Sequence, residues 1–206
     1  MKRLVNILII ALLPLATIAQ SAAPSADEVL NRFLQKIDAQ TLSSSFTITH
    51  FETANSPITL KGTMKIRGEK YRMSVADTEA AYDGKTLYIY KEQDNELTIT
   101  TPLTEEVLEA NPFLFARELQ KESRVRFSST NKDQKLYVIE LIPSDPRVAG
   151  SSKVTIKIRR SDWTPVEIVE REGESKTTIT FSDAAYSSAL PSFTISHPNA
   201  YINDLR

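Results

Sequence analysis

The sequence contains no cysteine, and this absence limits how the protein can be stabilised and anchored. No disulfide bond can form, so stability must come from a packed core. No N-terminal cysteine is present for lipid attachment either. We therefore expect a soluble mature protein without a lipid anchor.

Histidine and glycine are also scarce, which argues against most catalytic sites. The two histidines, His50 and His197, lack cysteine or acidic neighbours at the spacing of metal ligands, so no zinc site is expected. The five glycines form no nucleophile elbow, phosphate-binding loop or dinucleotide fingerprint. Glu105, Glu106 and Glu109 are interpreted as a solvated helix face rather than a catalytic pair. We therefore expect binding rather than catalysis, with no metal and no cofactor.

Positive charge is not in excess, since 25 lysines and arginines face 26 aspartates and glutamates. The densest basic cluster, Lys157 to Arg160, is interrupted by Ile158, as on the solvated face of a strand. Tyr88 and Tyr90 share one face of a strand, but a platform for stacked bases needs more basic neighbours than they have. We therefore expect no nucleic-acid partner.

The N-terminus has the pattern of a secretory signal peptide. Lys2 and Arg3 precede a largely apolar stretch, Leu4 to Ile18, and small residues follow. The apolar stretch is short for a membrane span and contains a proline. We expect residues 1–19 to be the signal peptide, with cleavage after Ala23 as the alternative. Residues 20–206 then have the length of a single domain.

A helix is predicted directly after this segment, up to about Gln40. Ser25 and Glu28 have the spacing of a capping box. Val29, Phe33 and Ile37 recur at helical intervals, so the helix lays one apolar stripe on another layer.

From Ser45 onward, apolar and polar residues alternate with the period of a β-strand. The pattern repeats in about ten segments, each with one polar and one apolar face. The last of these segments is Phe193 to Ile195. No long helix separates consecutive strands, which excludes a parallel α/β fold. A sheet of this size must curl, split or close.

One short apolar helical region interrupts the strands. Thr104 to Ala110 is followed by a second helix, in which Asn111 is the N-cap and Pro112 the first helical residue, ending near Lys121. These helices are expected to cover the concave face of the sheet. The predicted fold is mainly β with helices: an incomplete, half-open antiparallel β-barrel whose concave face is covered by a helical lid.

The space between sheet and lid is expected to be an apolar cavity, filled by side chains or by an apolar ligand. Strand alternation and helix periodicity select the residues of its walls. They are Phe33, Met64, Ile66, Met73, Leu87, Ile89, Leu97, Ile99, Phe113, Phe115, Ile139, Val154, Ile156, Val166, Ile168, Ile179 and Phe181.

Several segments, in order along the chain, resemble the periplasmic outer-membrane lipoprotein carrier family (LolA-type). Asp83 to Tyr90 is similar to the family's Asp-Gly-Lys-Thr-Leu-aromatic strand, and Asn111 to Arg117 is similar to its Pro-Phe-containing lid helix. Phe193 to Pro198 matches the end of the family pattern. The resemblance covers nearly the whole mature chain.

The resemblance implies an incomplete barrel that shields the acyl chains of lipid-modified proteins. The carrier would take its cargo from an inner-membrane lipoprotein-releasing transporter. It would pass that cargo to an outer-membrane acceptor or to the membrane itself, and would act as a monomer. Arg67 is the best match, across a gap, for the family arginine that tethers the lid.

Two other functions are compatible with the sequence. The first is a sensor or regulatory module on the same fold that binds lipids or lipoproteins, although such modules usually add a second domain. The second is a secreted hydrolase with an unrecognised site, which the sparse histidines and the missing cysteine disfavour.

Overall fold

The computed structural model describes residues 23–52, 57–145 and 152–206, so the expected signal peptide lies outside the described residues. The described residues form three helices and twelve strands. The helices are α1 (Ala26–Ala39), α2 (Thr104–Ala110) and α3 (Pro112–Lys121). The strands are β1 (Thr41–Phe51), β2 (Ile58–Arg67), β3 (Lys70–Val75), β4 (Thr78–Tyr82), β5 (Leu87–Lys91), β6 (Glu96–Thr100), β7 (Ser123–Phe127), β8 (Leu136–Pro143), β9 (Lys153–Arg159), β10 (Pro165–Glu172), β11 (Ser175–Ser187) and β12 (Tyr201–Asp204).

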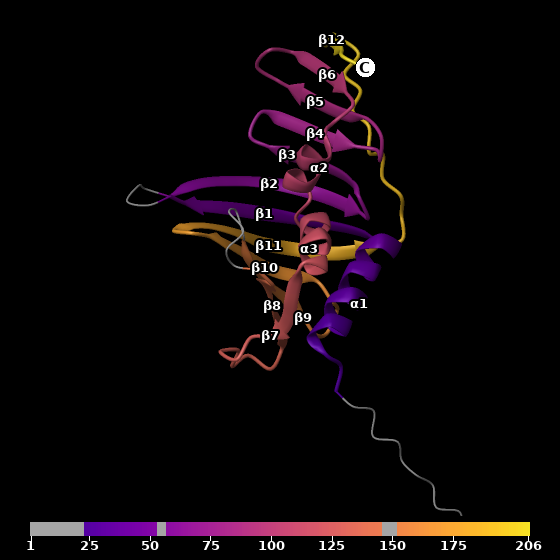
Figure 1. The fold of residues 1–206 in the computed structure, drawn as a ribbon. Coiled ribbons are helices and arrows are strands. Elements are labelled where there is room, and N and C mark those ends of the chain that lie inside the picture. The colour runs from indigo at the N-terminus through magenta and orange to yellow at the C-terminus, as the bar shows by residue number, and fades with distance from the viewer. Residues whose placement is uncertain (1–22, 53–56, 146–151) are drawn as a thin grey trace, which may run out of the picture.

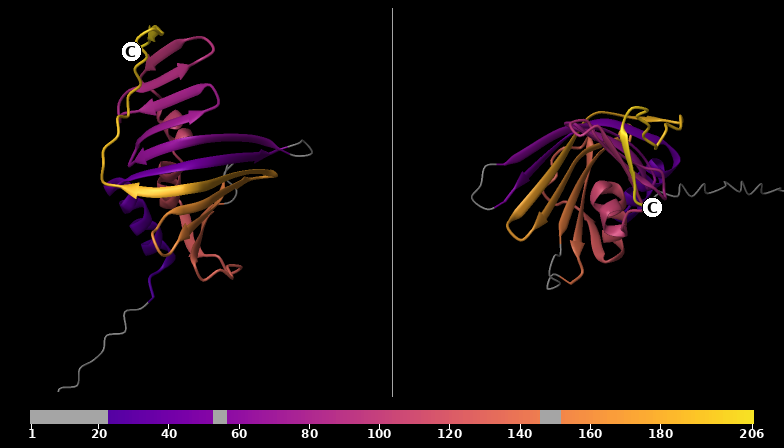
Figure 2. Two further views of the ribbon diagram at one scale, coloured as in Figure 1. Left: turned by 180° about the vertical axis from the view of Figure 1, so that it is seen from behind. Right: turned by 90° about the horizontal axis from the view of Figure 1, so that it is seen from above.

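All described strands belong to one sheet, in the order β12-β6-β5-β4-β3-β2-β1-β11-β10-β9-β8-β7. Neighbouring strands are antiparallel except for β12, which is parallel to β6. The end strands β12 and β7 do not pair with each other, so the sheet stays open. It curls around the helices, which lie on its inner side (Figures 1 and 2). This architecture confirms the predicted half-open barrel with a helical lid.

The face of the sheet toward α1 and α3 is called the concave face below, and the opposite face the convex face. Helix α1 begins as predicted: the Ser25 Oγ accepts from the Glu28 backbone N–H at 3.2 Å, and Glu28 Oε2 accepts from the Ser25 N–H at 2.7 Å. Its apolar stripe is buried against the concave face. Phe33 of α1 meets Phe113 of α3 edge to face, with ring centroids 5.6 Å apart. Burying such a side chain stabilises the fold by about 1.5–3 kcal/mol.

The sheet has more strands than the alternation predicted. The alternation did not predict β4, β7 or β12. Strand β4 is short and contains two alanines, β7 is short and contains two arginines, and β12 has only four residues. Phe193 to Ile195, predicted as a strand, is extended but makes no ladder. Phe193 and Ile195 are nonetheless buried, and Ile195 packs on the convex face.

Residues 188–200, called the C-terminal strap below, connect β11 to β12 across the convex face (Figure 2). Ile195 of this strap joins Ala81 and Leu97 in a second, smaller apolar cluster. The sheet is therefore covered on its concave face by the helices and on part of its convex face by the strap.

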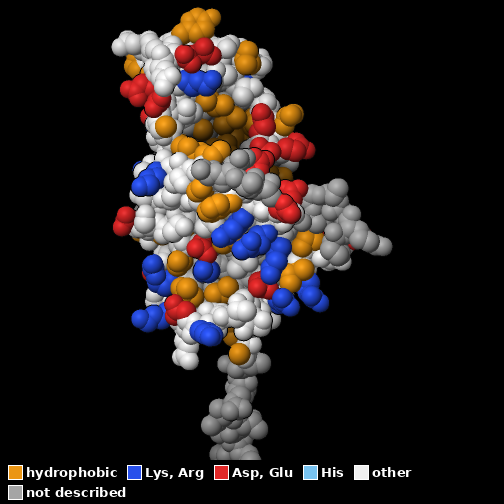
Figure 3. Space-filling view, turned by 90° about the vertical axis from the view of Figure 1, so that its left-hand side faces the viewer, with side chains coloured by type: hydrophobic (Ala, Val, Ile, Leu, Met, Phe, Trp, Pro, Cys, Tyr) orange, Lys and Arg blue, Asp and Glu red, His pale blue; other side chains and the backbone are white. Residues whose placement is uncertain are grey.

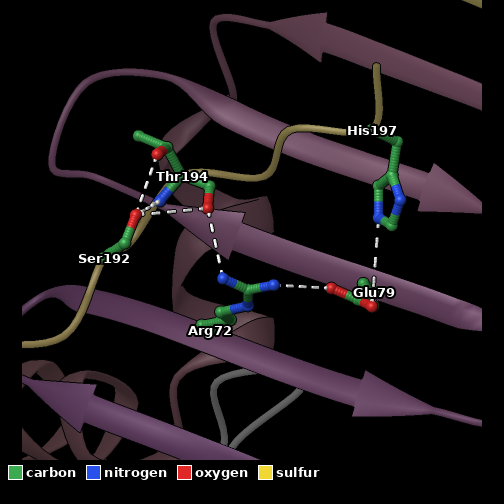
Figure 4. Close-up of polar contacts among 5 residues, drawn as sticks. All are labelled: Arg72, Glu79, Ser192, Thr194 and His197. Atoms are coloured by element: carbon green, nitrogen blue, oxygen red, sulfur yellow. Dashed lines mark hydrogen bonds and ion pairs between the residues drawn. The ribbon is translucent and has the colours of Figure 1, made fainter. Parts of the chain in front are cut away.

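Polar contacts also hold the strap to the sheet (Figure 4). Arg72 Nη1 donates to the Thr194 carbonyl at 3.4 Å, and its Nη2 lies 2.9 Å from Glu79 Oε2. The His197 ring stacks on Tyr90 with centroids 3.6 Å apart, and its Nε2 lies 4.0 Å from Glu79 Oε1. Helices and strap thus anchor opposite faces of one sheet.

Candidate functional site

The lid helix α3 is started by Asn111 and Pro112, as the sequence predicted. The Asn111 side-chain oxygen accepts from the backbone N–H groups of Phe113 and Leu114, each at 3.2 Å. Pro112 occupies the first helical position, where its missing N–H costs nothing. The first turn of α3 is therefore fixed by two adjacent residues.

Asn111 also joins the lid to the sheet. Its side chain is fully buried, and Nδ2 donates to the carbonyl of Gly68 at 3.0 Å and to that of Glu69 at 3.4 Å. Gly68 occupies the tight β2–β3 turn at a φ of 60°, a conformation that glycine adopts without strain. One amide thus caps the lid helix and binds the turn beneath it.

A second contact joins the lid to α1. Arg117 Nη2 lies 2.8 Å from each carboxylate oxygen of Asp38. Gln120 Nε2 also donates to Asp27 Oδ1 at 2.8 Å. Both contacts are exposed, so each is weaker than a buried pair.

Arg67 does not make the lid contact predicted for it. Its Nη1 donates to the Ser188 carbonyl at 3.4 Å, and in the part of the chain that the structure describes it forms no hydrogen bond with α2 or α3. The reason is strand alternation: Ile66 is buried on the concave face, so Arg67 points to the convex side. Asn111 and Arg117 hold the lid instead.

A groove of about 410 Å³ lies between the lid and the concave face of β1, β11, β10 and β9. Its walls combine aliphatic and aromatic side chains with a few polar ones. They are Ile48, Leu108, Glu109, Pro112, Phe115, Ser152, Val154, Ile168, Glu170, Glu172, Thr177 and Ile179. Its volume lies within the range of about 300–1,000 Å³ that is typical of small-molecule sites.

The groove's chemistry suits an apolar ligand. Ile168, Ile179 and Phe115 line it, while Glu170 and Glu172 follow Ile168 at alternate positions toward the end of β10. Each apolar wall residue gains about 25 cal/mol for every Å² of its surface that a ligand removes from water. The groove therefore combines an apolar wall with hydrogen-bond acceptors near the strand ends.

Burial in the main apolar core raises the pKa of one tyrosine. Tyr71 of β3 is buried, and this burial, assisted by Tyr82 and Glu106, raises the pKa of its phenol to about 12. The cause is desolvation, which disfavours the charged phenolate.

Most of the predicted wall residues do lie on the concave face. Phe115, Val154, Ile168 and Ile179 line the groove itself. The others belong to the main apolar core or pack against it, Phe33 and Phe113 from the helices and the rest from the concave face of the sheet. They are Phe33, Met64, Ile66, Met73, Leu87, Ile89, Phe113, Ile139, Ile156 and Phe181. The space beneath the lid is therefore mainly filled by side chains, and the groove is what remains open.

Leu97 and Ile99 do not belong to this wall. They are directly opposite Tyr90 and Tyr88 in the β5–β6 ladder, so they share the convex face with these tyrosines. There they belong to, or pack against, the small cluster beneath the C-terminal strap. Both faces of β5 have large apolar or aromatic side chains, Leu87 and Ile89 on one and Tyr88 and Tyr90 on the other. Hydrophobicity alone therefore could not decide which face of the sheet Leu97 and Ile99 occupy.

Val166 also lies elsewhere. The register between β10 and β9 shifts between Pro165 and Glu167, which makes Val166 the extra residue of a β-bulge. A bulge re-aims a side chain, and Val166 lines a separate hollow with Leu136 and Arg160.

Several groove residues were missing from the predicted set. Ile48 shares a face with Phe46, two residues earlier on β1, and is opposite Ile179 in the β1–β11 ladder. The alternation along this strand was therefore sufficient to predict it. Glu170 and Glu172 share the face of Ile168 and follow from the same parity. Leu108 and Pro112 come from the lid, for which the sequence carries no register relative to the sheet.

A sequence model of the family described as outer membrane lipoprotein carrier protein LolA matches residues 15–174. No curated protein sequence matches the chain. In the described residues, no helix combines the length and the apolar character needed to cross a membrane.

Several solved structures are similar to the chain at low sequence identity. An uncharacterised conserved protein from Thermus thermophilus is 10% identical, with a TM-score of 0.57, over 87% of this chain and 98% of that one. A LolA superfamily protein from Nitrosomonas europaea is 13% identical over 84% and 99%, with a TM-score of 0.41. LprF from Mycobacterium bovis is 11% identical over 82% and 96%, with a TM-score of 0.46. The family match spans most of the sequence, and the chain therefore belongs to the outer membrane lipoprotein carrier protein LolA family.

Proposed function

We propose that this protein is a periplasmic carrier that binds the acyl chains of lipid-modified proteins in the groove beneath its lid. It would carry them from an inner-membrane releasing transporter to an outer-membrane acceptor or to the membrane itself, as a monomer and without catalysis. The observation that carries the proposal is the groove, which is lined by Ile168, Ile179 and Phe115 between the concave face and the lid. Family membership supports the same ligand class.

The energetics explain why such cargo needs a carrier. Each CH₂ group that leaves an apolar environment for water costs about 0.8 kcal/mol, so a protein with two or more acyl chains does not leave a bilayer unaided. A carrier must compensate for most of this cost and still release the cargo. An open groove under a detachable lid meets both needs better than a closed cavity.

The lid's attachments are suited to repeated opening. Helix α3 has ten residues, too few for stability on its own, and it depends on docking. Outside its buried Phe113 and Ala116, it is held to α1 by exposed polar contacts such as Arg117 to Asp38. An entering acyl chain would therefore loosen the exposed side of α3 first, because the buried Asn111 and Phe113 dock its first turn.

The test is saturable binding of a fluorescent fatty acid to purified protein, with two variants on one strand. Ile179→Glu places a charge in the groove, whereas Thr180→Glu places the same charge on the exposed convex side of the neighbouring position. We expect Ile179→Glu to weaken binding at least tenfold, because a charge has to be desolvated, and Thr180→Glu to leave it unchanged.

Native protein offers a second measurement. Protein purified from the periplasm should retain lipid-modified polypeptides, which mass spectrometry would identify. Absence of saturable fatty-acid binding to the wild-type protein would contradict the proposal, and so would equal binding by the two variants at equal stability.

A further inference from the structure

Three basic side chains lie in a direct row across neighbouring strands. Lys176 of β11 is opposite Arg171 of β10, and Arg171 is opposite Lys153 of β9. Side chains at such positions start about 5 Å apart, and like charges there destabilise a sheet. These three residues are called the basic rim below. Figure 3 shows Lys and Arg side chains gathered in a row on this side of the molecule.

The rim is on the convex face. Val154 and Ile168 are buried on the concave face, so the alternating residues Lys153 and Arg171 point the other way. Glu170 and Glu172, which flank Arg171 in sequence, accordingly point to the concave side, where they line the groove. The two faces of the same strand ends thus have opposite charge.

The convex face supplies little negative charge to this row. Glu140 lies 3.4 Å from Lys153 Nζ but is shared with Arg126, at 2.8 Å. Among the described residues, Arg171 and Lys176 have no ion pair within 4 Å. These two adjacent cations therefore repel each other, and no described carboxylate forms an ion pair with either of them.

An exposed aromatic ring continues the rim. Phe51 of β1 is opposite Lys176, whose Nζ lies 5.8 Å from the ring centroid. Phe51 is 40% exposed on the convex face. Large apolar side chains beside lysine and arginine are the combination that binds the interface of an anionic bilayer.

We propose that the basic rim and Phe51 form a docking surface for an anionic lipid bilayer. The surface lies outside the groove, and docking does not require that the groove bind lipid. Its position matters for transfer, because Ser152, Glu172 and Thr177 at the same strand ends line the groove. A molecule docked by its rim would hold that end of the groove against the membrane.

A bilayer fits these residues better than an acidic protein does. The cations form a row along the strand ends, beside the exposed ring of Phe51. A lipid surface supplies phosphates in a plane together with hydrocarbon beneath them, and it relieves the repulsion between Arg171 and Lys176.

The test is co-sedimentation of fatty-acid-free protein with vesicles. One set is phosphatidylcholine alone, and the other is equal parts phosphatidylcholine and phosphatidylglycerol. We expect binding to the anionic vesicles only, weakening with added salt. Arg171→Gln combined with Lys176→Gln should lower the partition coefficient about 30-fold, since each basic residue contributes a factor of about five at an anionic surface.

Lys132→Gln combined with Lys135→Gln is the matched control, because both lysines are exposed on the β7–β8 connection and the change in net charge is the same. Urea denaturation should show the rim variant to be at least as stable as wild type, since like charges have been removed. Equal binding to both kinds of vesicle, equal loss in rim and control variants, or no vesicle binding would each overturn the proposal. Binding of soluble polyglutamate without vesicle binding would assign the rim to an acidic protein partner instead.

Discussion

Glu140 is a buried carboxylate on the convex side of β8, and three neighbouring side chains surround it. Arg126 donates to its Oε2 through Nε and Nη2 at 3.0 and 2.8 Å, and Ser128 Oγ donates to its Oε1 at 3.0 Å. Burial favours the neutral acid, but the hydrogen bonds from Arg126 and Ser128, with the charge of Lys153, outweigh it. They hold the pKa of Glu140 below its usual value of 4.5.

This residue makes the fold sensitive to acid in a definite direction. Because its pKa is lower in the folded state, Glu140 stabilises the protein above pH 4.5, and this stabilisation is lost as the pH falls through the lowered pKa. We expect Glu140→Gln to lower the free energy of unfolding by about 1–3 kcal/mol at neutral pH, and by less in acid. Urea denaturation across a pH series measures this. Glu167→Gln is the control, because its ion pair with Lys157 is more exposed than the contacts of Glu140. It should change the free energy of unfolding by less than about 1 kcal/mol. A pH-independent difference for Glu140→Gln would contradict the assignment.

Single residues also show where sequence reasoning reached its limit. Asn111 as a cap followed from the Asn-Pro pair, because capping depends on adjacent residues. Its bonds to Gly68 and Glu69 could not be predicted, since they depend on how the lid lies over a distant turn. For Arg67 the information was present, because its alternation with the buried Ile66 already placed it on the other face.

At the scale of elements, strand alternation predicted which face of the sheet meets the helices for most strands. It failed where a second layer covers the other face, as at Leu97 and Ile99, and where a bulge changes the phase, as at Val166. Charges in β7 and alanines in β4 concealed two strands whose pairing depends on neighbours distant in sequence. Once Ile168 is assigned to the concave face, the same alternation places Glu170 and Glu172 in the groove.

The two ion pairs of α3 should differ in their effect on the lid, because only one of them reaches another element. Arg117→Ala removes the link to Asp38 of α1, whereas Lys121→Ala removes a pair with Glu118 that lies within α3. An exposed pair contributes about 0.2–1 kcal/mol, so we expect Arg117→Ala to speed fatty-acid release up to about fivefold. Stopped-flow fluorescence and amide exchange of α3 measure release and opening. Lys121→Ala should leave both near wild type, and a matching change in the two variants would show that helix stability, not the α1 contact, holds the lid.

At the scale of the whole molecule, one open sheet serves two separate packing tasks. The strands β9, β10, β11 and β1 line the groove with the lid, and in the described chain no residue of the C-terminal strap contributes to it. The strap instead covers the convex face of the strands at the other end of the sheet, where Ile195 packs with Leu97 and Ala81. The groove and the strap cluster have no residue in common, and only the sheet connects them. A substitution in one region therefore makes no direct contact with the other.

This division predicts that the strap affects stability but not ligand binding. Ile195 is 4% exposed, and Ile195→Ala should lower the free energy of unfolding by about 2–5 kcal/mol. Ile202→Ala, at a position 58% exposed on β12, should cost less than about 0.5 kcal/mol. Amide exchange in Ile195→Ala should increase first in β5, β6 and β12, since these strands lose the layer above them. At temperatures where both variants are folded, fatty-acid affinity should equal that of wild type. A loss of affinity in Ile195→Ala without unfolding would show that strap and groove are coupled through the sheet, contrary to their separation in the structure.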